Sequence, residues 1–208
     1  MPHLSAPGAQ VNLRVEAGES LALVGPSGCG KTTALKSLAG FVTPDRGEVL
    51  IGGVPLGSFG LATYRAMTGC VLQEDRLFAG SIAENIAGFA EEIGRDWLIE
   101  CARVAAIDTE IQQMPMGYET LVGDMGSVFS GGQKQRVFLT RALYRKPHVL
   151  LLDEATSHLD EANERVINQA VANLSLTRIC VAHRLSTIAL TDRVGSFGHA
   201  VHAARASV

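Results

Sequence analysis

The sequence predicts an α/β fold in which a mostly parallel sheet is covered by helices on both sides. Two observations predict it. Short aliphatic runs alternate with helical patterns along the chain, and a glycine-rich turn at residues 25–32 connects one such run directly to a helix. With 208 residues, of which 47% are hydrophobic, the chain can bury the core of such a fold within one domain.

Each element is predicted by the spacing of its apolar residues, which alternate in a half-buried strand and recur once per turn in a helix. The expected strands are 11–15, 21–24, a strand and turn within 47–55, 70–72, 149–152 and 178–182. The expected helices are one from Lys31 with a cap at Gly40, stretches of 81–107 interrupted around Gly94, 134–146 and 161–174. Residues 114–126 are irregular, and GSFG at 195–198 is expected to break any strand.

The composition narrows the classes of function. Lys and Arg total 18 against 21 Asp and Glu, so the chain lacks the basic surface typical of proteins that bind nucleic acid or anionic lipid. The 4 cysteines form no C-x-x-C pair, which argues against a zinc site or a disulfide framework and favours a reducing, cytosolic setting. The longest aliphatic run, 149–152, is too short to cross a membrane, and residues 1–10 have no signal-peptide pattern.

A phosphate-binding loop is the strongest motif. Residues 25–32, GPSGCGKT, match G-x-x-x-x-G-K-[ST] between an apolar strand and a helix. The glycines let successive backbone amides face a β-phosphate, Lys31 reaches the β- and γ-phosphates, and the Thr32 hydroxyl can bind Mg²⁺. The alternative, a glycine turn that opens an ordinary helix, is disfavoured by this context.

Two carboxylates follow the aliphatic run 149–152. Asp153 and Glu154 stand at the end of a predicted strand, where open α/β sheets bind their ligands. Asp153 is expected to hold Mg²⁺ and Glu154 to polarise an attacking water. Taken alone, the pair is equally typical of a helix N-terminus, and it is the phosphate loop upstream that favours the catalytic interpretation.

A second glycine-rich helix start occurs at residues 129–133, FSGGQ. Its exposed amides and the Ser130 hydroxyl would suit an anion. Without the other motifs, a serine-capped helix start is the simpler interpretation.

Taken together, these motifs resemble the nucleotide-binding domain of ATP-binding cassette (ABC) transporters over about residues 11–193. The resemblance implies a P-loop NTPase core of the RecA-like type with an antiparallel β edge and an inserted helical subdomain. It implies a core at about 1–80 and 147–194, a helical lobe with the signature motif at about 81–146, and an atypical tail at 195–208. In this family S-G-G-Q contacts the γ-phosphate held by a second domain, which implies a head-to-tail dimer of two copies enclosing ATP.

Three more motifs match the family. Gln73, in VLQED, resembles the glutamine that binds Mg²⁺ and senses the γ-phosphate, and residues 157–160, SHLD, resemble the loop that crosses the dimer seam. His183, in VAHR, resembles the histidine that hydrogen-bonds the γ-phosphate and helps to hold the water. A lone histidine is ordinarily structural, and only the surrounding motifs favour this role.

The resemblance therefore implies ATP and Mg²⁺ as cofactors and a full set of site residues. The implied catalytic residues are Lys31, Gln73, Glu154 and His183. The implied nucleotide-binding residues are Gly25, Pro26, Ser27, Gly28, Cys29, Gly30, Lys31, Thr32, Thr33, Gln73, Ser130, Gly131, Gly132, Gln133 and Asp160, and the metal ligands are Thr32, Gln73 and Asp153.

The strings LFAGSIAENI and MPMGYETLVGDMGS are most similar to ABC exporters, above all to those fused to a peptidase domain in bacteriocin secretion of the colicin V type. The resemblance implies ATP hydrolysis that powers export of a substrate such as a peptide bacteriocin. Its partners would be transmembrane domains, fused or separate, and not nucleic acid. The domain would lie at the cytoplasmic face of a bacterial inner membrane. Two alternatives stay open: a truncated domain that binds nucleotide and hydrolyses it poorly, and an ABC ATPase without a transport role.

The chain departs from the family pattern in three places. Phe129 stands where the family usually has leucine, a swap between bulky apolar residues that should leave the loop amides in place. No aromatic residue precedes Phe41, so the ring that usually stacks on adenine is missing, which is expected to lower nucleotide affinity by about 1–3 kcal/mol. In the atypical tail, His199 and His202 are expected to be exposed to solvent rather than bound to metal.

Overall fold

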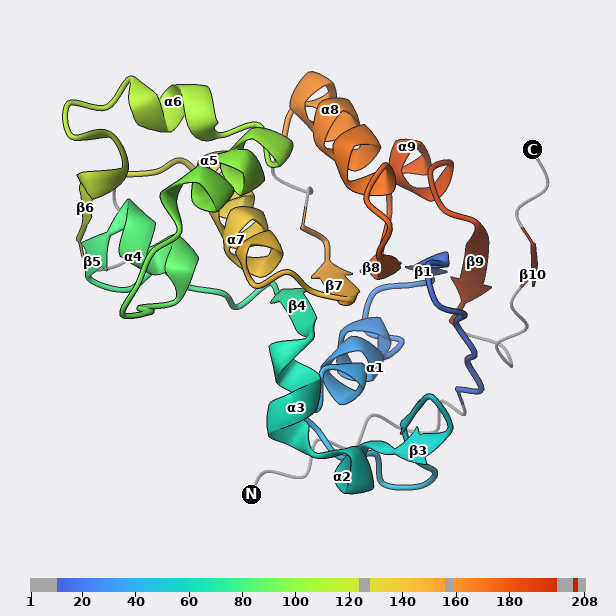
Figure 1. The fold of residues 1–208 in the computed structure, drawn as a ribbon. Coiled ribbons are helices and arrows are strands. Elements are labelled where there is room, and N and C mark those ends of the chain that lie inside the picture. Colours follow the sequence, from blue (N-terminus) through green and yellow to red (C-terminus); the bar gives the residue numbers. More distant parts are fainter. Residues whose placement is uncertain (1–10, 124–127, 156–158, 198–203, 206–208) are drawn as a thin grey trace. The chain divides into compact units, whose positions relative to one another are not determined.

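The computed structural model describes residues 11–123, 128–155, 159–197 and 204–205 (Figure 1). These residues fold into two compact units. The first unit takes the residues up to 68, 148–153 and those from 176 onward, and the second takes 69–147 and 154–175. The first unit carries the sheet with its helices, and the second is mainly helical.

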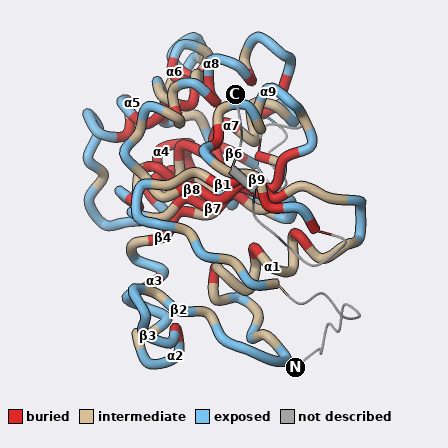
Figure 2. The backbone as a smooth tube through the Cα atoms, turned by 90° about the vertical axis from the view of Figure 1, so that its right-hand side faces the viewer, coloured by how far each residue is buried: buried red, intermediate tan, exposed pale blue. Residues whose placement is uncertain are grey.

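A mostly parallel sheet forms the centre of the first unit. Its strands are β1 (Ser20–Val24), β7 (Val149–Asp153), β8 (Thr177–Val181), β9 (Arg193–Ser196) and β10 (Ala204–Arg205). Within this unit they lie in the order β10-β9-β1-β8-β7, and all pairs are parallel except β10 with β9. Leu21, Ile179 and Leu151 stand in register across β1, β8 and β7, and all three are buried. Figure 2 shows buried backbone, in red, where these strands lie. The predicted α/β class with a mostly parallel sheet is confirmed.

Helix α1 (Lys31–Leu38) packs against β7 and β8 and buries Leu35 completely. It is capped by Gly40 as predicted, because Gly40 has a φ of +71°, the left-handed conformation typical of the residue after a helix. The N–H groups of Gly40 and Phe41 donate back to carbonyl groups of the last turn at 3.0 and 2.9 Å. The other elements of this unit are β2 (Leu50–Ile51), β3 (Val54–Pro55), α2 (Leu56–Phe59), α3 (Leu61–Ala66) and α9 (Leu185–Ile188).

Two predictions about strands are wrong. The segment 11–15 alternates between half-buried and exposed side chains, but it is not a strand, and its Arg14 carbonyl accepts a hydrogen bond from the Arg193 guanidinium at 2.9 Å. At the other end of the chain, the glycines at 195–198 do not prevent a strand, since β9 continues to Ser196. Gly195 is accommodated because it stands opposite Leu23 of β1, in the register of a regular parallel pair.

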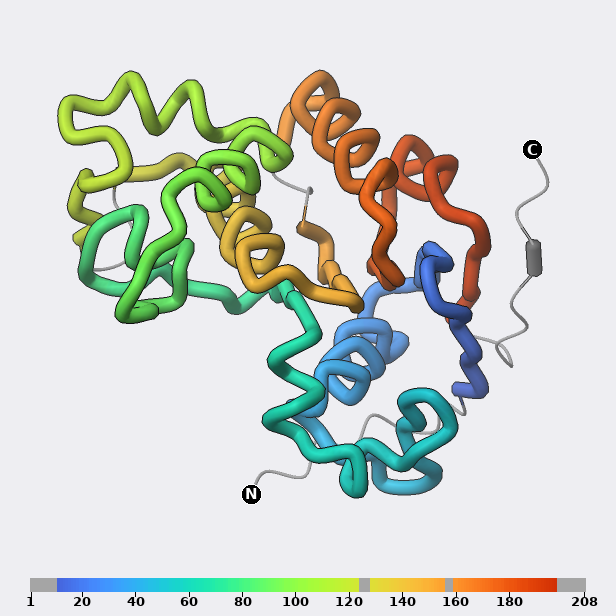
Figure 3. Tube along the Cα trace, viewed as in Figure 1, coloured from blue at the N-terminus to red at the C-terminus, as the bar shows by residue number. Residues whose placement is uncertain are grey.

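Helix α7 (Gly131–Tyr144) is the longest helix in the described part of the second unit. It packs against α4 (Ile82–Ala87) and α5 (Arg95–Val104), whose paths can be followed in Figure 3. It begins at Gly131 rather than at 134, while the break predicted around Gly94 is confirmed, because α5 begins after it. The other elements are β4 (Thr68–Val71), which leads into this unit, β5 (Gly80–Ser81), α6 (Asp108–Gln112), a 3-10 turn (Gly117–Glu119), β6 (Leu121–Val122) and α8 (Glu161–Ala172).

Among the residues that the structure describes, no helix has both the length and the apolar character needed to span a bilayer.

Asp192 fastens the start of β9 to β1. Its Oδ2 accepts hydrogen bonds from the Ser20 hydroxyl at 2.6 Å and from the Ser20 N–H at 2.8 Å. These two bonds lower the pKa of Asp192 below its ordinary value. A carboxylate with a lowered pKa in the folded state stabilises the fold above its unfolded pKa of about 3.9, and this contribution is lost as the pH falls through the folded pKa.

We expect Asp192→Asn to lower the free energy of unfolding by up to about 1 kcal/mol at neutral pH, a modest amount because the side chain is exposed. The difference from the parent chain should shrink as the pH falls below about 4. Urea unfolding at neutral pH and near pH ~3 measures this, with Asp45→Asn at an exposed position of the same unit as the control. A difference of equal size at both pH values would contradict a role for the ionised carboxylate.

Candidate nucleotide-binding site

The phosphate-loop motif lies in the first unit and connects β1 to α1. Gly25, Gly28 and Gly30 have φ angles of +152°, +77° and +101°, which favour glycine. At Gly25 a side chain is also excluded by space, because a Cβ atom would lie 2.5 Å from the Phe197 carbonyl oxygen. The glycines therefore permit the tight strand-to-helix turn, which leaves residues 26–28 exposed.

The Lys31 ammonium group lies inside this turn. Lys31 is the first residue of α1 and is only 5% exposed. Its Nζ donates to the carbonyl oxygens of Gly25 and Pro26, both at 2.8 Å, and lies 3.8 Å from Cys29 Sγ. A positive charge held at the start of a helix, beside a glycine-rich turn whose residues 26–28 are exposed, is suited to binding phosphate.

Thr32 and Asp153 meet beside the turn, although 121 residues separate them in the chain. Thr32 Oγ1 donates to Asp153 Oδ1 at 3.3 Å, and Asp153 is the buried last residue of β7. A hydroxyl and a carboxylate are oxygen ligands of the kind that Mg²⁺ prefers. This donor set therefore fits a magnesium ion at the start of α1.

The direction of the strands explains why these groups gather. β1, β8 and β7 are parallel neighbours, so their carboxyl ends lie at one edge of the sheet, which is where open α/β sheets bind ligands. Gly25 follows β1, Asp153 ends β7, and the exposed His183 comes shortly after β8. The first unit thus brings the phosphate loop, Asp153 and His183 to the same edge.

The other predicted site residues belong to the second unit. Gln73 is exposed and follows β4. Glu154 directly follows Asp153 in the chain and has a φ of +52°, a left-handed conformation that is uncommon outside glycine. The Glu154 carbonyl oxygen accepts a hydrogen bond from Gln135 Nε2 at 3.3 Å, so a side chain of α7 holds this strained residue.

Ser130 caps α7, as the simpler interpretation of FSGGQ predicted. The Ser130 N–H donates to Gln133 Oε1 at 2.8 Å, and the Gln133 N–H donates to Ser130 Oγ at 3.3 Å, which together form a capping box. Ser130 and Gly131 are both exposed, so the capped helix start stays accessible to an anion. Phe129 is buried, which fits a position that needs a bulky apolar residue.

Asp160 caps α8. Its carboxylate accepts hydrogen bonds from the N–H groups of Asn163 at 3.0 Å and Ala162 at 3.1 Å, and the bonds from Asn163 above all lower the pKa of Asp160. The neighbouring Ser157 and His158 of the predicted seam loop lie outside the described residues, as do His199 and His202 of the tail.

Three residues around the predicted site carry contacts that the sequence did not indicate: Glu110, Gln135 and Arg136. Gln135 bonds the Glu154 carbonyl, and Glu110 bonds the side chains of Gln133 and Arg136. The spacing of Gln133 and Arg136 places them on one face of a helix, which was a usable signal. Glu110 gave none, because 23 to 26 residues separate it from its partners.

Comparisons with known proteins all point to the same family. A family model described as ABC transporter matches residues 9–157. The chain is 53% identical over 184 residues to the colicin V secretion/processing ATP-binding protein CvaB of Escherichia coli, and 52% identical to the probable microcin-H47 secretion/processing ATP-binding protein MchF of the same organism. Each alignment covers 88% of this chain and 26% of the relative, so the chain spans about a quarter of the length of these relatives.

Less similar proteins point to the same family. ABC transporter B family member 17 of Arabidopsis thaliana is 46% identical over 86% of this chain and 15% of its own length. A solved structure of a bacterial Atm1-family ABC exporter with ATP bound superposes with a TM-score of 0.83 and 40% identity, over 88% of this chain and 32% of that one. With the phosphate loop, the Thr32–Asp153 pair and the capped SGGQ helix in place, the chain belongs to the ABC transporter family, as an ATP-binding domain.

Proposed function

We propose that this chain binds ATP together with Mg²⁺, hydrolyses it, and thereby powers export across a membrane. The observation that carries the proposal is the edge of the sheet at which the Lys31 turn, the Thr32–Asp153 pair and His183 lie together. The charges are complementary: a triphosphate is strongly anionic, and Lys31 and the amides of the turn are electropositive.

Each residue has a role that follows from its chemistry. Lys31 neutralises phosphate charge, and Thr32, Asp153 and Gln73 hold Mg²⁺ through oxygen atoms. When bound, the ion supplies further charge stabilisation for the phosphates. Glu154 polarises the attacking water by accepting its proton, and His183 hydrogen-bonds the γ-phosphate and orients that water.

A second copy of the chain completes the proposed site. The Ser130 hydroxyl and the amides that follow it would bind the γ-phosphate held by the phosphate loop of the partner copy, with Asp160 near the dimer seam. ATP therefore favours the closed pair, and loss of the γ-phosphate removes the contact that closes it. This differential binding converts hydrolysis into movement.

The partner that the movement drives is proposed to be a transmembrane domain, fused or separate, at the cytoplasmic face of a bacterial inner membrane. The names of the two Escherichia coli relatives point to a secreted peptide of the colicin or microcin kind as the substrate class. On this proposal the core and helical lobe divide near residues 81 and 147, as the family resemblance implies.

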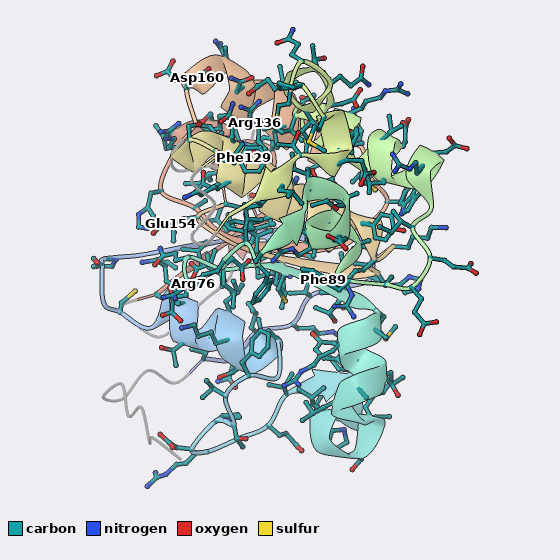
Figure 4. All side chains as sticks on the ribbon, turned by 90° about the vertical axis from the view of Figure 1, so that its left-hand side faces the viewer. Arg76, Phe89, Phe129, Arg136, Glu154 and Asp160 are labelled. Carbon is teal, nitrogen blue, oxygen red and sulfur yellow. The ribbon has the colours of Figure 1, made fainter. Side chains whose placement is uncertain are left out.

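The surface near residues 73–88 is the proposed contact with the transmembrane partner, and two exposed aromatic rings support this placement. Phe78 and Phe89 are 60% and 49% exposed, with ring centroids 6.1 Å apart (Figure 4 labels Phe89). Asn85 fixes Phe78 by both backbone groups, because its Oδ1 accepts from the Phe78 N–H and its Nδ2 donates to the Phe78 carbonyl, each at 2.8 Å. Aromatic residues held rigidly at a surface are typical anchors of protein interfaces.

Glu154→Gln tests the proposed hydrolysis. The amide keeps the size of the side chain but cannot accept a proton, so we expect steady-state phosphate release to fall at least ~100-fold. ATP binding should persist, and an ATP-dependent dimer should accumulate because the bound nucleotide is no longer consumed. Phosphate release and sedimentation measure the two effects.

Glu91→Gln is the matched control, since it removes an exposed carboxylate of the same unit. It should leave both quantities unchanged. Undiminished phosphate release by Glu154→Gln would refute the role given to Glu154.

Alkylation of Cys29 tests the placement of the nucleotide. Burial raises the pKa of Cys101 to about 12 and that of Cys180 to about 11, so these two thiols should react slowly with a maleimide. In a Cys70→Ala background we expect Cys29 to react first, ATP to protect it, and its alkylation to block ATP binding by steric exclusion. Mass spectrometry and nucleotide-binding measurements follow the two events.

Cys29→Ala serves as the control, and should retain ATP binding and resist inactivation by the maleimide. Modification of Cys29 without loss of nucleotide binding would contradict the placement of the triphosphate in the 25–32 turn.

A further inference from the structure

A buried arginine connects the Ser130 helix start to the separate helix α6. Arg136, which Figure 4 labels, belongs to α7. It is 6% exposed. Its Nη1 donates to Glu110 Oε1 at 2.5 Å and to the Ala106 carbonyl at 2.7 Å, and its Nη2 donates to Glu110 Oε2 at 3.1 Å. A buried guanidinium needs such partners, so Glu110 is the counter-charge of Arg136.

The same carboxylate makes a second contact, to the side chain of Gln133. Gln133 Nε2 donates to Glu110 Oε2 at 2.7 Å, while Gln133 Oε1 accepts from the Ser130 N–H at 2.8 Å. Both ends of the amide are therefore used. The reversed amide would place its oxygen against a carboxylate and its NH₂ against an N–H, so the negative charge of Glu110 selects the orientation that bonds Ser130.

Glu110 lies on helix α6, which other contacts hold in place. Ala106, just before α6, has a φ of +53°, and Arg136 binds its carbonyl group. Two residues before Glu110, the buried Asp108 accepts a hydrogen bond from the Tyr118 hydroxyl at 2.7 Å. Contacts thus hold α6 both at its entry and along its side, and Glu110 presents its carboxylate from there to α7.

The ionisation state of Glu110 suits this arrangement. Partial burial raises the pKa of Glu110, but the hydrogen bonds from Arg136 and Gln133 outweigh it and leave the pKa lowered. The carboxylate is therefore ionised at neutral pH, as its contacts with two donors require.

We propose that Glu110 is a positioning residue for the Ser130 phosphate contact, acting through the Gln133 side chain. It orients the amide of Gln133, which holds the backbone of Ser130 and so aims the serine hydroxyl and the start of α7 at the phosphate. This inference rests on the proposed function, in which Ser130 binds the γ-phosphate of a partner copy. A purely structural ion pair between Glu110 and Arg136 would brace α6 against α7 without affecting that contact.

The test separates phosphate binding at the chain's own loop from the contact made by Ser130. In the Glu154→Gln background, we measure the affinity of the monomer for ATP and the dissociation constant of the ATP-dependent dimer by sedimentation. For Glu110→Gln we expect ATP affinity to change less than ~2-fold and the dimer dissociation constant to rise about 10-fold, since each dimer contains two such contacts and each loses a charge-assisted hydrogen bond.

Glu100→Gln is the matched control, because Glu100 pairs with Arg103 on the surface of the neighbouring helix α5. It carries the same change of charge and should alter neither quantity. Glu110→Asp provides a second variant that keeps a negative charge near Arg136 but is one CH₂ group shorter, so its carboxylate reaches neither Gln133 nor Arg136 as closely. It should weaken the dimer in the same direction, with a smaller loss of thermal stability than Glu110→Gln.

A double-mutant cycle with Gln133→Met decides between the two roles. If Glu110 acts through Gln133, Glu110→Gln should change the dimer dissociation constant less than ~2-fold once Gln133 is replaced. An effect of Glu110→Gln that is equally large with and without Gln133, or no effect on a dimer that the parent forms, would overturn the positioning role. A parent that forms no ATP-dependent dimer at all would overturn the proposed function, and the role of Glu110 with it.

Discussion

Parallel pairing of β1 with β8 and of β8 with β7 is the constraint on which the site of the first unit depends. Parallel neighbours present their carboxyl ends at one edge, so the turn after β1, the carboxylate of Asp153 and the loop with His183 must gather there. The aliphatic strands supply this alignment, because Leu21, Ile179 and Leu151 are buried in register. The polar chemistry at the edge is therefore positioned by apolar packing behind it.

The second unit depends on a different constraint, a buried charge that must be paired. The buried Arg136 guanidinium is paired with Glu110 and with the Ala106 carbonyl, and these contacts hold α6 beside the first two turns of α7. Helix α7 then carries polar side chains at its start whose partners are defined. Gln133 faces Ser130 and Glu110, while Gln135 reaches the Glu154 carbonyl.

Local patterns predicted the parts of the fold and of the site that depend on local chemistry. The phosphate turn, the cap at Gly40 and the buried strand before Asp153 follow from glycine, proline and aliphatic spacing within a few residues. The wrong predictions concern segments in which tertiary contacts decide whether a strand forms. The alternating segment 11–15 pairs with no strand among the described residues, and β9 passes through Gly195 because β1 offers it a parallel neighbour. The role of Glu110 could not be predicted from the sequence for the same reason, because its partners lie on another helix.

The first two turns of α7 carry residues for two parts of the proposed reaction. Its N-terminus holds Ser130, the residue proposed to contact a phosphate in the partner copy, and Gln135 bonds the carbonyl of Glu154, whose φ of +52° costs backbone energy. A strained residue keeps its conformation only while its surroundings hold it. On the proposed function, one helix therefore carries at its start the residue that contacts the partner's phosphate and, five residues on, the side chain that holds the backbone of the water-polarising Glu154.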